Sequence, residues 1–317
     1  MEIKSLGTVL EVSVKKIIIT GATSFLGRNV INGLLKDDCL IYALCRPNSS
    51  SVEFLPENKK LNIVYGSLAD MEAVLTDIKK ADVFIHFAWD GSGRQGRADE
   101  IVQNKNAEYA VKALGIAKKL GCNKFIFPGS QAEYGIRQDI MRETDICKPV
   151  SAYGKAKLLF QELAEKENNL KDITLIHLRI FSVYGFGDRT GTLVDSCINT
   201  FNSGNKIELG PCKQYWNFLY IDDFVYVIRK FVEENVCGGV YNIASDDTRI
   251  LRAFVDEIWK LSNKSGRYIY GSDSFNPEGV PNLKPDISEL LGVIGKSYSF
   301  TSFEQGITGI MRKKGIN

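Results

Sequence analysis

The chain has 317 residues, of which 44% are hydrophobic and 25% charged; this globular composition excludes a disordered or fibrous protein. Forty lysines and arginines against 38 aspartates and glutamates leave a formal charge of +2, which provides no general field for nucleic acid or an anionic membrane. Two histidines and seven scattered cysteines without a Cys-x-x-Cys pair argue against a Ser-His-Asp hydrolase, a metal site and a disulfide framework.

We expect no signal peptide at the amino terminus. Glu2 and Glu11 interrupt the short apolar stretches of residues 1–16, unlike the apolar region of a signal peptide. No run approaches the roughly 18 apolar residues of a membrane span. We therefore expect a cytoplasmic protein with reduced thiols and no membrane partner.

Short apolar strands alternate with amphipathic helices from residue 15 to residue 180. We expect strands at 17–19, 40–44, 61–65, 83–87, 124–127 and 174–180, and helices at 27–36, 71–79, 104–120 and 152–167. Strands that are apolar throughout belong to a parallel sheet covered on both faces. This pattern predicts an α/β fold with a doubly wound, Rossmann-type parallel sheet.

The pattern is looser after residue 180. We expect helices at 193–201, 251–262 and 303–313, a strand and a helix within 219–232, and a strand at 240–244. Residues 271–285 hold three prolines and are expected to form a loop. We assign 1–180 to a dinucleotide-binding domain to which 219–248 returns, and 181–218 with 249–317 to a smaller substrate-binding lobe.

The segment from Thr20 to Gly27 follows the first strand and opens the first helix. Glycines in such a turn let backbone N–H groups approach a pyrophosphate at the helix N-terminus, although a purely structural turn would look the same. Serine stands at position 24 where the pattern Gly-x-x-Gly-x-x-Gly has glycine, and it still offers an N–H and a hydroxyl. The candidate cofactor-binding residues here are Gly21, Thr23, Ser24, Phe25, Leu26 and Gly27.

The end of the second strand indicates which dinucleotide binds. An NAD site usually places a carboxylate there, whereas an arginine accommodates the 2′-phosphate of NADP. The strand ends in Cys45-Arg46 with no acid. Arg46 therefore favours NADP over NAD, and a solvated arginine at a strand end is the alternative interpretation.

Three residues are candidates for catalysis. Tyr153 and Lys157 share one face of a predicted helix, and a cation beside a phenol lowers its pKa toward the range useful for proton transfer. Ser130 follows the strand at 124–127, so it is expected at the carboxyl edge of the sheet, where α/β folds bind ligands. A capping or turn serine is the alternative there.

Together these motifs resemble the extended short-chain dehydrogenase/reductase family of nucleotide-sugar epimerases, dehydratases and reductases. The resemblance covers nearly the whole chain and implies a nucleotide-sugar substrate and a homodimer packed through the helices around Asn106 and Tyr153. The further cofactor-binding residues that it implies are Ser67, Leu68, Phe87, Ala88, Asn106, Phe181 and Val183, besides Tyr153 and Lys157. The substrate-binding residues that it implies are Trp89, Gln131, Ser182 and Trp216.

The resemblance also implies a mechanism, in which hydride passes at C4 of the sugar while Tyr153 exchanges a proton with the C4 oxygen held by Ser130. Gln131-Ala132 follows the serine, where the 4,6-dehydratases have Asp-Glu and the bifunctional epimerase–reductases have cysteine at the second position. The reactions that this pattern leaves open are those that need only a hydride and one proton, namely 4-ketoreduction and 4-epimerisation.

Arg46 favours the reductase, because reductases use NADPH whereas the epimerases that this chain resembles usually retain NAD. We expect NADPH-dependent reduction of a nucleotide-linked 4-keto-6-deoxysugar. A 4-epimerase with retained NAD stays open. A non-catalytic NADP(H)-sensing protein also stays open, because Ser24, Ser67 and Trp216 depart from the family pattern.

Overall fold

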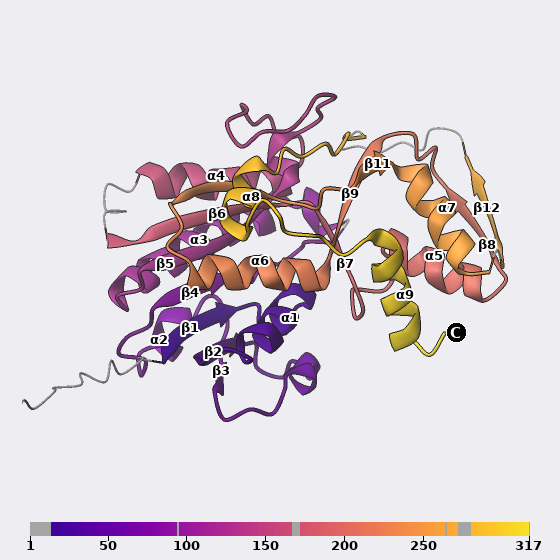
Figure 1. The fold of residues 1–317 in the computed structure, drawn as a ribbon. Coiled ribbons are helices and arrows are strands. Elements are labelled where there is room, and N and C mark those ends of the chain that lie inside the picture. Colours follow the sequence, from indigo (N-terminus) through magenta and orange to yellow (C-terminus); the bar gives the residue numbers. More distant parts are fainter. Residues whose placement is uncertain (1–13, 94, 167–171, 264, 272–279, 317) are drawn as a thin grey trace, which may run out of the picture.

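The computed structural model describes residues 14–93, 95–166, 172–263, 265–271 and 280–316 (Figure 1). Seven parallel strands form its central sheet in the order β10-β6-β5-β4-β1-β2-β3. They are β1 (Lys15–Thr20), β2 (Cys39–Cys45), β3 (Leu61–Tyr65), β4 (Val83–His86), β5 (Lys124–Ser130), β6 (Thr174–Ile180) and β10 (Gly239–Ile243). The chain winds outward from β1 in both directions, which confirms the predicted doubly wound fold.

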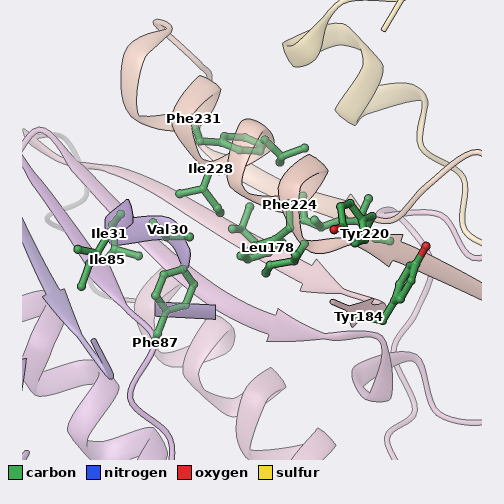
Figure 2. Close-up of a cluster of buried hydrophobic side chains, with 14 of the residues drawn as sticks. Val30, Ile31, Ile85, Phe87, Leu178, Tyr184, Tyr220, Phe224, Ile228 and Phe231 are labelled. Carbon is green, nitrogen blue, oxygen red and sulfur yellow. The ribbon is translucent and has the colours of Figure 1, made fainter. Parts of the chain in front are cut away.

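Helices cover both faces of this sheet (Figure 1). One face carries α1 (Phe25–Leu34), α6 (Ile221–Glu233) and α8 (Ser288–Ile294), and the other carries α2 (Met71–Val74), α3 (Glu100–Lys119) and α4 (Ala152–Lys166). Ile17 and Ile19 pack into the first core and Ile18 into the second, so β1 is apolar on both sides. Figure 2 shows the first core, where Phe224 and Ile228 of α6 lie over the sheet.

The remaining elements gather beside the sheet (Figure 1). A three-stranded sheet contains β7 (Ser182–Tyr184), β9 (Tyr215–Tyr220) and β11 (Thr248–Ile250), and a two-stranded sheet contains β8 (Lys206–Leu209) and β12 (Arg267–Tyr270). The helices of this part are α5 (Leu193–Asn202), α7 (Leu251–Leu261) and α9 (Phe303–Lys313). Of these strands, the sequence analysis expected only part of β9, because the others mix polar and apolar residues and lack the continuous apolar runs of the central strands.

We propose the domain division expected from the sequence, with one addition concerning α8. Strand β10 joins the large sheet, and α6 packs against α1. Helix α8 lies within 249–317 but packs against β10 and α6. It therefore belongs with the dinucleotide-binding part rather than with the substrate lobe.

Several expected elements differ in length from those observed, among them α2 and β5. Helix α2 ends at Val74 instead of residue 79, and the following apolar residues Leu75 and Ile78 are buried in turns that lead to β4. Strand β5 continues past Phe127 to Ser130. The loop expected at 271–285 is described only at residues 271 and 280–285, because 272–279 lie outside the described residues. The described part forms no helix and contains one isolated β-bridge, between Pro285 and Met141.

Candidate active site

The turn between β1 and α1 fits a dinucleotide. Gly21 has φ +66°, and a Cβ there would lie 2.5 Å from the backbone nitrogen of Ala88. A Cβ on Gly27 would lie 2.3 Å from the carbonyl oxygen of Gly21. These approaches require glycine at both positions and leave the N-terminal N–H groups of α1 at the carboxyl edge of the sheet, where a pyrophosphate can bind.

Ser24 replaces the middle glycine by acting as the N-cap of α1. Its Oγ accepts a hydrogen bond from the Gly27 N–H at 3.1 Å, and its own N–H donates to the Gly21 carbonyl at 3.0 Å. A serine cap satisfies one of the free N–H groups of the first helical turn and stabilises the helix start. The neighbouring candidates in this turn, all half-buried, are Thr23, Phe25 and Leu26.

Arg46 lies just beyond β2 and pairs with Asp90, which follows β4. The Nη1–Oδ1 distance is 3.7 Å, and the two side chains are 75% and 62% exposed. Since β1 lies between β2 and β4, the pair spans the end of β1 where the dinucleotide turn begins. Asn106 holds the main chain of Asp90 through two hydrogen bonds of 3.0 and 2.8 Å, so its amide positions this loop.

The other candidates implied for the cofactor have identifiable local contacts. Ser67 donates its hydroxyl to the Asp70 carboxylate at 2.6 Å, and Leu68 beside it is half-buried. Phe87 is buried against Phe224, and the Ala88 N–H donates to the Thr20 hydroxyl at 3.2 Å. Phe181 is buried and Val183 half-buried where β6 passes into β7.

Ser130, Tyr153 and Lys157 come together where β5 ends and α4 begins. The Ser130 side chain lies beside the Tyr153 phenol and lowers its pKa. The Lys157 ammonium donates to the Pro128 carbonyl at 2.6 Å and lies 5.6 Å from the centroid of the Tyr153 ring. The three predicted catalytic residues therefore share one site at the carboxyl edge of the sheet.

Trp89 closes one side of this site. The Lys157 Nζ lies 3.6 Å from the centroid of the indole, and the Tyr153 ring meets the indole edge-on at 6.2 Å. The indole Nε1 donates to Gln103 Oε1 at 2.7 Å, which fixes the orientation of the ring. A cation over an indole face is stabilised without being neutralised.

Sequence reasoning did not identify Arg97, which faces the phenol. Arg97 is the middle residue of the short 3₁₀ helix Gly96–Ala98, and its guanidinium carbon lies 4.2 Å from the centroid of the Tyr153 ring. Burial raises the pKa of Tyr153, and the Arg97 charge is the largest influence lowering that pKa, followed by the Ser130 side chain. The cation that lowers the pKa of Tyr153 most is thus the Arg97 guanidinium, whereas the sequence analysis predicted Lys157 for this role.

Lys157 itself is 2% exposed, and burial lowers its pKa well below the usual value. The carboxylate of Glu133 acts in the opposite direction, while Arg97 lowers the lysine pKa further. An isolated ammonium is costly to bury. Glu133 is therefore a second charged residue that shifts the pKa of a predicted catalytic residue and that the sequence analysis did not identify.

The substrate-binding candidates fall into two groups. Trp89 and Gln131 lie beside Tyr153 and Ser130 respectively. Ser182 and Trp216 lie on β7 and β9, which are neighbours in the three-stranded sheet. The Trp216 Nε1 is buried with no hydrogen-bond partner among the described residues, so an indole donor remains available there.

Two further properties concern only the residues that the structure describes. No group of three or more His, Cys, Asp and Glu side chains in them is placed to hold a metal ion. Their helices are all too short or too polar to cross a membrane.

Comparison with known proteins identifies several relatives of this chain. A model of the NAD dependent epimerase/dehydratase family matches residues 17–244. CDP-abequose synthase of Salmonella muenchen is 25% identical over 95% of this chain and 98% of its own length. GDP-6-deoxy-D-talose 4-dehydrogenase of Aggregatibacter actinomycetemcomitans is 24% identical over 90% of this chain and 94% of its own length. The Bordetella bronchiseptica enzyme WbmG, solved with NAD and UDP, has a TM-score of 0.81 at 19% identity, over 95% of this chain and 96% of its own.

Proposed function

The chain belongs to the NAD dependent epimerase/dehydratase family, and from this premise we propose that it reduces the 4-keto group of a nucleotide-linked 4-keto-6-deoxysugar with NADPH. The family match confirms the resemblance found in the motifs and identifies an enzyme that modifies nucleotide sugars. It disfavours the non-catalytic NADP(H)-sensing protein. One relative is named as a 4-dehydrogenase of a GDP-linked 6-deoxy sugar, which supports both the reacting position and the substrate class.

The observation that carries the proposal is the convergence of Ser130, Tyr153 and Lys157 near a turn that fits a dinucleotide. When bound, the dinucleotide supplies the hydride. The Ser130 hydroxyl holds the C4 oxygen of the sugar, and the Tyr153 phenol gives its proton to that oxygen. One hydride and one proton convert the ketone to an alcohol. Burial raises the pKa of Tyr153 and keeps the proton donor in its acid form at neutral pH.

Cofactor consumption tests the proposal. The enzyme is incubated with NADPH and a panel of nucleotide-linked 4-keto-6-deoxysugars, and the absorbance of the reduced nicotinamide is followed. We expect one NADPH to be oxidised for each keto-sugar reduced. Failure to oxidise NADPH with any keto-sugar would exclude the reductase.

A 4-epimerase with retained NAD is the second candidate, and Asp90 favours it. This carboxylate lies 3.7 Å from Arg46 and would repel a 2′-phosphate. The WbmG structure was solved with NAD. An epimerase interconverts hydroxylated nucleotide sugars without net oxidation of added cofactor, so the same panel supplemented with 4-epimeric hexoses distinguishes the two reactions.

Replacement of Arg46 tests the cofactor choice. In Arg46→Ala we expect the Kd for NADPH to rise about tenfold, because the variant lacks the guanidinium that makes one charge-assisted contact to the 2′-phosphate. The Kd for NADH should stay within about twofold. Titration of nicotinamide fluorescence measures both constants. Lys60→Ala removes a comparable exposed cation that pairs with Asp38 and should change neither. Tighter NADH than NADPH binding in the unaltered protein would contradict the assignment.

Replacement of Arg97 tests the electrostatics of the phenol. The Arg97 charge lowers the pKa of Tyr153, so Arg97→Gln raises that pKa. A reductase needs the protonated phenol and loses activity as pH rises through this pKa. The alkaline limb of the kcat profile should therefore move to higher pH, whereas Arg97→Lys, which keeps the charge, should move it less. An unchanged limb in Arg97→Gln would show that the guanidinium does not act on Tyr153.

We also propose a cytoplasmic homodimer. All seven cysteines are unpaired, which suits a reducing compartment. Ile101 of α3 and Leu163 of α4 are exposed apolar side chains on the two helices expected at the dimer interface. Light scattering that gives the mass of a single chain would reject the dimer.

A further inference from the structure

A buried carboxylate lies directly behind Ser130. Glu133 is fully buried, and its Oε1 accepts the main-chain N–H of Ser130 at 2.7 Å. In return, the Ser130 Oγ accepts the Ala132 N–H at 3.2 Å, and the two residues form a capping box at the short 3₁₀ helix Gln131–Tyr134. The backbone that carries the Ser130 hydroxyl is thus fixed by a charged acceptor.

Two side chains of β6 hold this carboxylate in place. His177 Nε2 lies 3.0 and 2.9 Å from the two oxygens of Glu133, and Arg179 Nε donates to Oε2 at 3.0 Å. Both side chains are at most 3% exposed. Arg179 is anchored in turn by the Glu143 carbonyl at 3.0 Å. The charge of Glu133 is therefore compensated by a guanidinium within the protein interior.

Gly129 leaves the room that this arrangement needs. A Cβ on Gly129 would lie 2.2 Å from His177 Nε2 and 2.6 Å from Glu133 Oε1. Any side chain at this position would displace the carboxylate from Ser130. The residue preceding Ser130 is thus part of the same arrangement.

Glu133 also acts on the other two catalytic residues through its charge. It raises the pKa of Lys157 and contributes to the raised pKa of Tyr153. Glu133 thus contacts the Ser130 main chain directly and shifts the pKa values of Lys157 and Tyr153 through its charge.

We propose that Glu133 is a positioning residue, whose carboxylate, held by His177 and Arg179, fixes the Ser130 main chain and so places the Ser130 hydroxyl beside Tyr153. This inference rests on the proposed function. The Glu133 carboxylate is fully buried behind Ser130. It acts through Ser130 and through the charges of the site.

The first test is Glu133→Gln, measured by kcat, KM, the Kd for the dinucleotide and Tm. Loss of the charged anchor should lower kcat by about 10²-fold, as a small displacement of a reacting group does, with KM and Kd within about twofold. The alkaline limb of the kcat profile should move to lower pH, because removal of a negative charge lowers the pKa of Tyr153. A wild-type kcat with an unshifted profile would overturn the proposal.

A double-mutant cycle separates action through Ser130 from a general weakening of the fold. In the Ser130→Ala background, Glu133→Gln should cost at most about threefold more, because residues that act as a unit are not additive. Full additivity of the two losses would contradict action through Ser130. His177→Phe, which leaves the Glu133–Arg179 pair, provides a milder variant in case Glu133→Gln does not fold, and should lower kcat by about tenfold. An unchanged kcat in folded His177→Phe would count against the proposal.

Asp223→Asn is the matched control. Asp223 is another buried carboxylate, held by the Tyr298 hydroxyl at 2.7 Å and the Thr301 N–H at 3.1 Å, and it lies on α6. This variant should lower Tm while leaving kcat and its pH profile unchanged. If Tyr153→Phe is inactive and Glu133→Gln is not impaired, only the positioning role fails; if Tyr153→Phe remains active, the proposed function itself fails.

Discussion

Tyr153→Phe should lower kcat by about 10³-fold or more while NADPH binds as in the unaltered protein. The substitution removes the phenolic proton that the reduction delivers to the C4 oxygen and keeps the ring that packs against Trp89 and under Arg97. Turnover of keto-sugar and fluorescence titration of NADPH measure the two properties separately. The Tm should stay within a few degrees, because the ring contacts are retained.

Tyr241→Phe is the matched control for this prediction. Tyr241 is also a buried tyrosine, and its hydroxyl donates to the Cys237 carbonyl at 2.9 Å on the edge strand β10. Its replacement should leave kcat within about twofold. A Tyr153→Phe enzyme that keeps more than a tenth of the wild-type rate would remove Tyr153 from the role of proton donor and leave the site without an assigned acid.

The main elements were predictable because burial on both faces makes the strands apolar throughout. In β1 the run Ile17-Ile18-Ile19 marks the strand directly. The end of β5 was not predictable in the same way, because Pro128 and Gly129 usually terminate a strand. The structure continues the ladder with β6 through both residues to Ser130. Ser130 is therefore the last residue of β5 rather than part of a loop.

The electrostatic residues of the site could not be predicted from local patterns. Arg97 follows Gly96 in a polar segment and reaches Tyr153 only through the tertiary fold. Glu133 lies three residues after Ser130, but a glutamate is usually exposed, and burial requires the two β6 partners that the fold supplies. By contrast, Ser24 could be interpreted in advance, because capping of a helix is a local property of the sequence.

Lys157→Met should lower kcat by about 10²-fold or more without lowering Tm. The Lys157 ammonium is buried, and no carboxylate lies within ion-pair distance of it among the described residues. Burial of such a cation costs stability, and methionine fills a similar volume without that cost. A lysine kept in this environment is therefore explained by function, through its contacts with Pro128 and Trp89 next to Tyr153.

The pH dependence follows from the direction of the lysine pKa. Burial lowers it well below the usual value, so the ammonium loses its proton at a lower pH than an exposed lysine would, and activity that needs the charge is lost as pH rises. Arg97 lowers and Glu133 raises the pKa of both Lys157 and Tyr153, so the shifts expected for the alkaline limb in Arg97→Gln and Glu133→Gln have the same direction whichever of the two groups limits activity. Lys124→Met is the matched control, since Lys124 is also buried but donates to the Phe231 and Val232 carbonyls at 3.0 and 3.1 Å, away from the site. That variant should lower Tm and leave kcat unchanged. Two results would show that the two lysines have the same structural role. One is an equal loss of kcat in Lys157→Met and Lys124→Met, and the other is a lower Tm with wild-type kcat in Lys157→Met.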